Sequence, residues 1–228
     1  MGVTNMAHLR FSDGATRPAP RVQGFSMLEV LVTLIIVTVG LLGLAGLKAR
    51  AHVSELESYQ RAQALVMVSD MVERIRVIRV NAPCFAITTA SAGSPVYGTG
   101  SAAFSACTAA SGAAATLNNT LADDSKTTWD NLLKGSSETS SSGGATTNVG
   151  AMIGARGCVS YNAGSELISA TSGAPMSGTG IYTVSVAWQG MSDTVANVNF
   201  LCGTGLFGAE AKRRVVSTAF RIANLTLN

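Results

Sequence analysis

One carboxylate, Glu29, lies inside an apolar run that extends from Phe25 to Leu47. As a helix, these 23 residues would span roughly 34 Å, enough to cross the hydrocarbon core of a membrane. An ionised side chain in hydrocarbon costs at least about 2.5–3.5 kcal/mol, and such residues are usually paired and functional. Glu29 therefore predicts charge pairing within a membrane. The alternative is a plain signal anchor whose charge reaches one membrane face.

The second set of reactive residues is four cysteines, spread through the chain after the apolar run: Cys84, Cys107, Cys158 and Cys202. No two are close enough for a CxxC metal knuckle, and the only histidines, His8 and His52, lie outside this region, so a zinc site is not expected. An even number of cysteines in an exported chain predicts two disulfides, with three possible connectivities. We prefer the sequential pairing, Cys84–Cys107 and Cys158–Cys202, because each bond then closes one sub-region of the chain.

Catalytic motifs are missing from the sequence. It holds no GxSxG, HExxH, Walker-type or dinucleotide-binding pattern, and no histidine lies in the C-terminal part. We therefore expect neither an enzyme nor a cofactor. Without the residues before Phe25, 13 basic residues face 12 acidic ones, a balance that argues against nucleic acid as a partner.

A helical pattern must position Glu29 and continue beyond the apolar run. Between Ala51 and Arg79, apolar residues recur at three- to five-residue steps and charged residues fill the other faces, which indicates an amphipathic helix. The apolar positions are Leu56, Tyr59, Ala62, Val66, Met71, Ile75 and Ile78. The stop is predicted at Asn81-Ala82-Pro83.

The stretch RVQGFSMLEV, residues 21–30, resembles the signal of type IV pilins and of type II secretion pseudopilins. The resemblance implies that a prepilin peptidase cuts between Gly24 and Phe25 and that Phe25 becomes the N-methylated terminus. It also implies a role in subunit assembly for Glu29. The new terminal amine of one subunit would lie against Glu29 of a neighbour, so that two costly buried charges satisfy each other. Recognition of Glu29 by membrane machinery is the alternative role.

Further stretches are similar to the PilV-type minor pilins: GLLGLAGL at residues 40–47, DMVERIR at 70–76, YTVSVAWQG at 182–190 and RRVV at 213–216. This resemblance implies four segments: a cleaved leader (1–24), a transmembrane and polymerisation helix (25–47), an amphipathic helix (48–82) and a periplasmic, disulfide-containing head (83–228). The expected fold class is α+β, with the long N-terminal helix packed on a C-terminal antiparallel sheet.

Within the head, the sequence predicts a short helix over 125–133 and strands over 157–161, 181–189, 195–202 and 212–225. The Ala/Ser/Thr/Gly-rich stretches 88–116 and 135–149 are predicted to be loops. Trp188 is expected in the core. Arg213 and Arg214 could contact a partner or protect a sheet edge, and we favour the second interpretation.

The resemblance favours a minor pilin that helps to initiate type IV pilus assembly with other minor pilins, at the pilus tip. The expected partners are the prepilin peptidase, other minor pilins, the major pilin, the inner-membrane assembly machinery and a tip adhesin. The expected location is the bacterial inner membrane, with the head in the periplasm, and then the surface pilus. The alternatives are a minor pseudopilin of a type II secretion system and a signal-anchored periplasmic binding module.

Overall fold

The computed structural model describes residues 24–108, 112, 115–150, 152–195 and 198–223. The predicted leader 1–24 lies outside the described residues except for Gly24. The chain divides into two compact units at Ala49/Arg50. Helix α1 (Met27–Val77) belongs to both units. Its residues 27–49, which we call the apolar half of α1, lie in the first unit. The rest of the helix and the head lie in the second. The apolar half is exposed throughout its length and is long and apolar enough to cross a membrane.

Helix α1 ends at Val77, four residues before the predicted stop at Asn81. A 3-10 segment, η1 (Arg79–Phe85), follows it. The buried Asn81 departs from helical geometry, with φ −106° and ψ 15°. Its amide nitrogen donates to Asn119 Oδ1 at 2.5 Å and to Cys107 Sγ at 3.1 Å. These tertiary bonds hold the chain away from the helix path, an effect that local propensity cannot predict.

The head contains a four-stranded antiparallel sheet in the order β1-β4-β5-β6. The strands are β1 (Tyr97–Gly98), β4 (Arg156–Asn162), β5 (Ile181–Gln189) and β6 (Arg213–Arg221). With the long N-terminal helix, the sheet confirms the predicted α+β fold. Trp188 on β5 is buried, as predicted.

The strand predicted at 195–202 is wrong. Its described residues form turns and irregular backbone, and Val195 and Val198 are 96% and 78% exposed. The Arg213 guanidinium donates to the carbonyls of Phe200 at 2.5 Å and Cys202 at 3.4 Å. A side chain therefore satisfies carbonyls that a neighbouring strand would otherwise bind. The last strand ends at Arg221, and Leu225, where it was predicted to end, lies outside the described residues.

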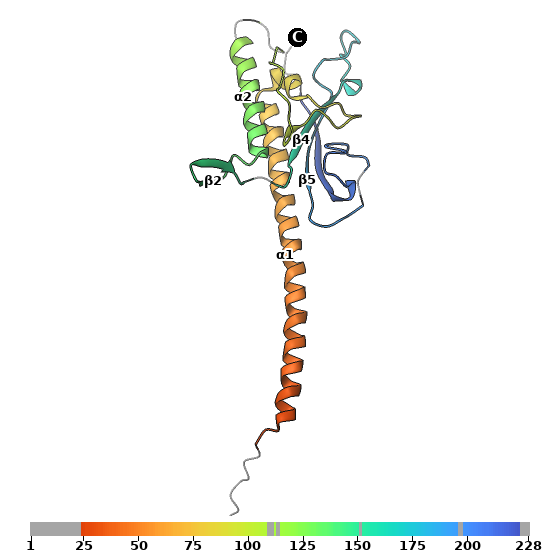
Figure 1. Cartoon of the computed structure of the whole chain (residues 1–228). Coiled ribbons are helices and arrows are strands. Elements are labelled where there is room, and N and C mark those ends of the chain that lie inside the picture. Colours follow the sequence, from red (N-terminus) through yellow and green to blue (C-terminus); the bar gives the residue numbers. More distant parts are fainter. Residues whose placement is uncertain (1–23, 109–111, 113–114, 151, 196–197, 224–228) are drawn as a thin grey trace, which may run out of the picture. The chain divides into compact units, whose positions relative to one another are not determined.

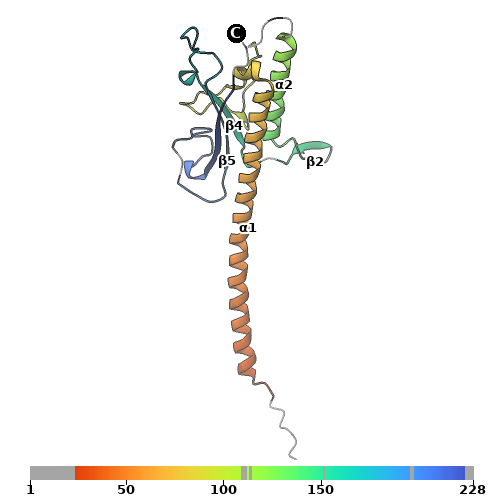
Figure 2. The same cartoon turned by 180° about the vertical axis from the view of Figure 1, so that it is seen from behind.

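Two elements of the head are longer or more regular than predicted. Helix α2 (Ala115–Leu133) begins ten residues before the predicted position. A hairpin of β2 (Thr139–Ser142) and β3 (Ala145–Asn148) replaces the loop predicted over 135–149. Gly143 and Gly144 form its two-residue turn, with φ 61° and 83°, a conformation that glycine adopts without strain. Figures 1 and 2 show α2 beside the head portion of α1.

The core of the head lies between the last turns of α1, helix α2 and the sheet. The residues that α1 buries there are Ala64, Val68, Met71, Val72 and Ile75. Trp129 of α2 is fully buried; its Nε1 donates to the Met67 carbonyl at 3.0 Å, and its ring lies edge-on to Tyr97. Of the predicted apolar stripe, Leu56, Tyr59 and Val66 are exposed, so α1 turns only its later apolar residues toward the head.

Two disulfides cross-link the head, Cys84–Cys107 and Cys158–Cys202. The first of the four cysteines is bonded to the second and the third to the fourth, which is the sequential pairing. The first bond joins η1 to the segment that precedes α2. The second joins β4 to the long β5–β6 connection.

Replacing Cys158 and Cys202 by alanine is expected to lower the free energy of unfolding by about 4 kcal/mol. The bond spans 44 residues, and the unfolded chain without it gains the corresponding loop entropy. The measurement is urea denaturation of the full chain in detergent micelles, followed by tryptophan fluorescence. The Cys84→Ala/Cys107→Ala variant is the matched control, with an expected loss of about 3.5 kcal/mol because its loop is shorter. A loss below about 1 kcal/mol would contradict the prediction.

Candidate functional site

The N-terminal segment carries the predicted processing and assembly residues. Gly24 and Phe25 are exposed and precede α1 directly, and Phe25 is 84% exposed. Ser26 caps the helix, since its Oγ accepts a bond from the Glu29 N–H at 3.2 Å. Ser26 and Glu29 have the spacing of a capping box, a signal that the sequence analysis missed. Gly24, Phe25 and Glu29 thus lie together within one turn of the helix start.

Glu29 stands in the first turn of α1 with its side chain exposed. A carboxylate is favoured at a helix N-terminus because the helix dipole is positive there. No ion pair to Glu29 exists within the described part of the chain. Around it, apolar side chains such as Leu28, Val30 and Leu31 are at least half exposed. This arrangement leaves an acceptor for a positive charge on an otherwise apolar helix surface.

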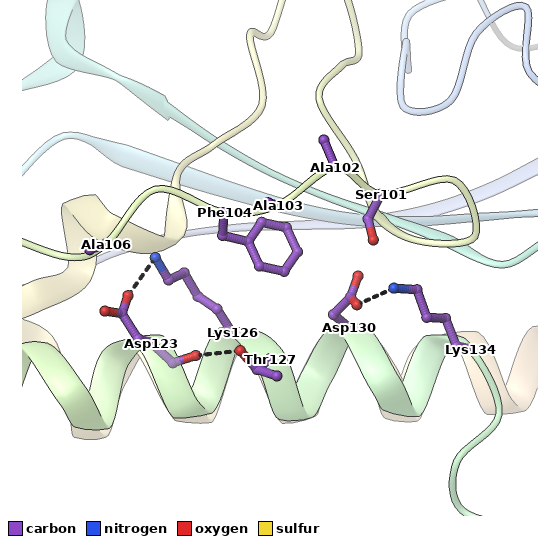
Figure 3. A pocket seen from close by; sticks show the side chains of 10 residues that line it. All are labelled: Ser101, Ala102, Ala103, Phe104, Ala106, Asp123, Lys126, Thr127, Asp130 and Lys134. Carbon is purple, nitrogen blue, oxygen red and sulfur yellow. Dashed lines mark hydrogen bonds and ion pairs between the residues drawn. The ribbon is translucent and has the colours of Figure 1, made fainter.

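In the head, one pocket of about 490 Å³ lies between α2 and the segment 101–106 (Figure 3). Charged side chains line its α2 side in two pairs. Lys126, 2% exposed, contacts Asp123 Oδ1 at 2.8 Å and donates to the Ser105 carbonyl at 2.8 Å. Asp130, 5% exposed, pairs with Lys134 at 2.5 Å and accepts the Gly98 N–H at 2.6 Å.

Through the Gly98 N–H and the Ser105 carbonyl, these pairs attach α2 to the segment 98–105. Burial tends to raise the pKa of Asp123, but the bonds from Lys126 and the Cys107 N–H outweigh it and leave that pKa lowered. Since both lysines are paired with carboxylates, the pocket has no uncompensated charge among its lining residues. The sequence analysis missed all four residues, although their i,i+3 and i,i+4 spacing on one face of an amphipathic helix is a readable signal.

A second polar cluster joins α1 to the β5–β6 connection inside the head. Glu57 Oε1 accepts bonds from Ser192 Oγ at 2.8 Å, from the backbone N–H groups of Met191 and Ser192 at 3.1 Å, and from Arg214 Nη2 at 3.3 Å. The Ser192 bonds, helped by the Arg214 charge, lower the pKa of Glu57. Arg213 pairs with Glu210 at 2.7 Å. Both arginines thus have partners inside the head.

Replacing Glu57 by glutamine is expected to lower the stability of the head by about 1 kcal/mol at neutral pH, because a charged acceptor of several bonds is lost at a partly exposed site. Since the folded-state pKa is depressed, this contribution is present above the ordinary pKa of 4.5 and disappears as the pH falls through the folded-state value. The stability difference between wild type and variant should therefore shrink as the pH falls below 4.5 and vanish once Glu57 is protonated in the folded state as well. Urea denaturation at several pH values measures it, with Glu55→Gln as the exposed control. A pH-independent difference would contradict the prediction.

The described residues contain no group of three or more histidine, cysteine, aspartate or glutamate side chains that could hold a metal ion. The structure places the predicted residues in two sets. Gly24, Phe25 and Glu29 lie at the start of α1, and the four cysteines lie in the head as two bonds.

Residues 20–45 match the family model described as the prokaryotic N-terminal methylation motif. In this segment the protein is type IV pilin-like. The motif is a prepilin-type signal, so it implies processing by a prepilin peptidase and assembly with other pilins. Together with the apolar half of α1, it fits a membrane-anchored structural subunit. Neither the curated proteins nor the solved structures give a match.

Proposed function

We propose that the protein is a minor pilin that helps to initiate type IV pilus assembly with other minor pilins and stays at the pilus tip. The observation that carries this proposal is the start of α1. There the methylation motif coincides with an exposed apolar helix that presents one unpaired carboxylate, Glu29. In the proposed mechanism, cleavage of the peptide bond after Gly24 frees the Phe25 amine. The peptidase then methylates this amine, which stays cationic at neutral pH.

Assembly then follows from charge pairing. In hydrocarbon, an unpaired amine and an unpaired Glu29 carboxylate each carry a large desolvation cost. When two subunits stack with an axial offset, the amine of one lies against Glu29 of the other, and both costs fall. One offset is favoured because any other leaves both charges unpaired. The apolar half of α1 is thus a membrane anchor before assembly and a packing element afterwards.

The location of the head follows from the proposed membrane anchor. We place it in the periplasm of the bacterial envelope, where disulfides such as Cys84–Cys107 and Cys158–Cys202 form and persist. After extraction from the inner membrane, the subunit enters the pilus next to the major pilin, and its head can display a tip adhesin.

Replacing Glu29 by alanine tests the pairing directly. The variant is expected to be cleaved normally but to reach the pilus fraction at least tenfold less than wild type, because the neighbour's amine stays unpaired. Immunoblots of sheared pili and membranes, with the mass of the mature N-terminus, measure both steps. The matched control is Glu55→Ala, which removes an exposed carboxylate later on the same helix. Normal incorporation with full piliation would refute the pairing.

A gene deletion distinguishes a role in the pilus from a role in type II secretion. A minor pilin is required for surface pili, whereas a pseudopilin of a type II system is required for the release of secreted enzymes. Loss of pili with normal secretion supports the proposal, and the opposite result overturns it.

A further inference from the structure

We propose that the β2–β3 hairpin of one copy adds to the open β6 edge of a second copy, so that the sheet continues from one head into the next. The inference rests on the membrane anchoring in the proposed function, because copies of the chain held in one membrane have their heads on the same side of it. It adds a contact between heads that does not involve Glu29. We call residues 139–148 the arm and the outer side of β6 the open edge.

The open edge is long and poorly protected. Strand β6 has nine residues, all in continuous register with β5, and it ends the sheet. Within the described residues, no backbone hydrogen bond reaches its outer side between Arg214 and Arg221. Proline, a bulge and inward charges usually protect an edge strand, but residues 215–220 have no proline and no charge. Such an edge is a template for another strand.

The arm is a strand pair without a core of its own. All eight strand residues are exposed and none is apolar except Ala145. Isolated two-stranded hairpins are at best marginally stable in water, because they bury too little surface. The arm is held at its base, where Val149 donates to the Glu138 carbonyl at 2.9 Å and Gln63 of α1 donates to the Gly150 carbonyl at 2.9 Å. Its own outer edges are free to form backbone hydrogen bonds with another strand.

The two elements lie on opposite sides of the head. In Figures 1 and 2 the arm extends from one side of α1, while β5 lies on the other side. An arm therefore cannot reach the open edge of its own head. A second copy can supply that edge, and the contact is then head-to-tail, which allows it to repeat.

Charge favours this pairing over a symmetrical one. Two β6 edges paired antiparallel about their centre, Ser217, would set Arg213 of one copy opposite Arg221 of the other, with Arg214 next to it, and opposed like charges are destabilising. The arm has no charged residue between Thr139 and Asn148, so it can lie beside β6 without that repulsion. A four-residue strand is about 13 Å long and fits within the six uncharged residues of the edge, about 20 Å.

Cross-linking of full-length protein in native membranes and pili tests the contact. One tagged copy carries Ser141→Cys in the arm and a differently tagged copy carries Thr218→Cys in the edge; both positions are exposed. With a short bismaleimide, we expect a mixed dimer from the pair and a ladder of multimers when one chain carries both substitutions. Thr128→Cys, on an exposed face of α2, replaces Ser141→Cys as the matched control and should give at least tenfold less product.

The outcomes separate this inference from the proposed function. Incorporation into pili without the mixed cross-link overturns the inference alone. A dimer from Thr218→Cys by itself also overturns it, because it shows a symmetrical edge contact. If the unsubstituted chain never reaches the pilus fraction, the proposed function fails, whatever the cross-linking in membranes.

Discussion

Replacing Gly24 by leucine is expected to leave the leader attached, so that almost all of the protein keeps the mass of the precursor. The structure shows why this variant isolates processing from folding. A Cβ atom at Gly24 would meet no described atom within 4 Å, so a larger side chain has no steric cost in the folded chain. The expected defect therefore arises at the peptidase, which in the proposed mechanism accepts glycine before the cleaved bond.

Intact-protein mass spectrometry of membrane extracts measures this effect. Gly43→Leu is the matched control, because Gly43 is also free of neighbours within 4 Å but lies inside the apolar half of α1. The control should be cut normally and begin with methylated Phe25. A Gly24→Leu variant that still begins at Phe25 would refute the cleavage assignment.

Replacing Gly157 by alanine is expected to destabilise the head by about 3 kcal/mol, the upper part of the range for overpacking. Gly157 lies on β4, where a Cβ would stand 2.1 Å from Trp129 Cη2 and 2.7 Å from Leu133 Cδ1. Both neighbours are fully buried, and Trp129 is also held by its bond to the Met67 carbonyl. Neither can move aside without disturbing the core between α2 and the sheet.

A double variant tests that explanation. Phenylalanine at position 129 lacks the outer ring atoms that approach Gly157. Although Trp129→Phe alone should be destabilising, it should relieve the clash, so the two substitutions together should cost less than the sum of their separate effects. The measurement is urea denaturation in micelles, followed by circular dichroism so that loss of the tryptophan does not affect the signal. Gly164→Ala, whose nearest neighbour is 3.3 Å away, is the control. Additive costs would show that Trp129 is not the obstacle.

Local sequence patterns correctly predicted the elements that have a regular alternation of apolar and polar residues or a long apolar run. Strand β5, Ile181–Gln189, was predicted with its observed bounds. Alternation of apolar and polar residues indicates a strand with one face more buried than the other. The apolar run at 25–47 likewise indicated the first half of α1. Both signals depend on residues next to each other in the sequence.

Patterns failed where distant contacts decide the structure. The exposed apolar residues Leu56 and Tyr59 have the same period as the buried Met71, and a period does not tell which part of a helix the head covers. The segment 195–202 alternates like a strand, but none of the strands in the described part of the chain pairs with its described residues. Glu57 contacts residues that follow it by 134 to 157 positions, so no local signal could identify it.

The position of the two disulfides has a mechanical consequence. If the protein is a pilus subunit as proposed, load on the pilus pulls on it, and a force that enters the head from α1 follows the covalent chain through η1. At Cys84 it can pass directly to Cys107, and at Cys158 directly to Cys202. The segments between these cysteines cannot lengthen, even when their hydrogen bonds break. Under tension, a head built in this way can extend only through the segments outside its two covalent loops.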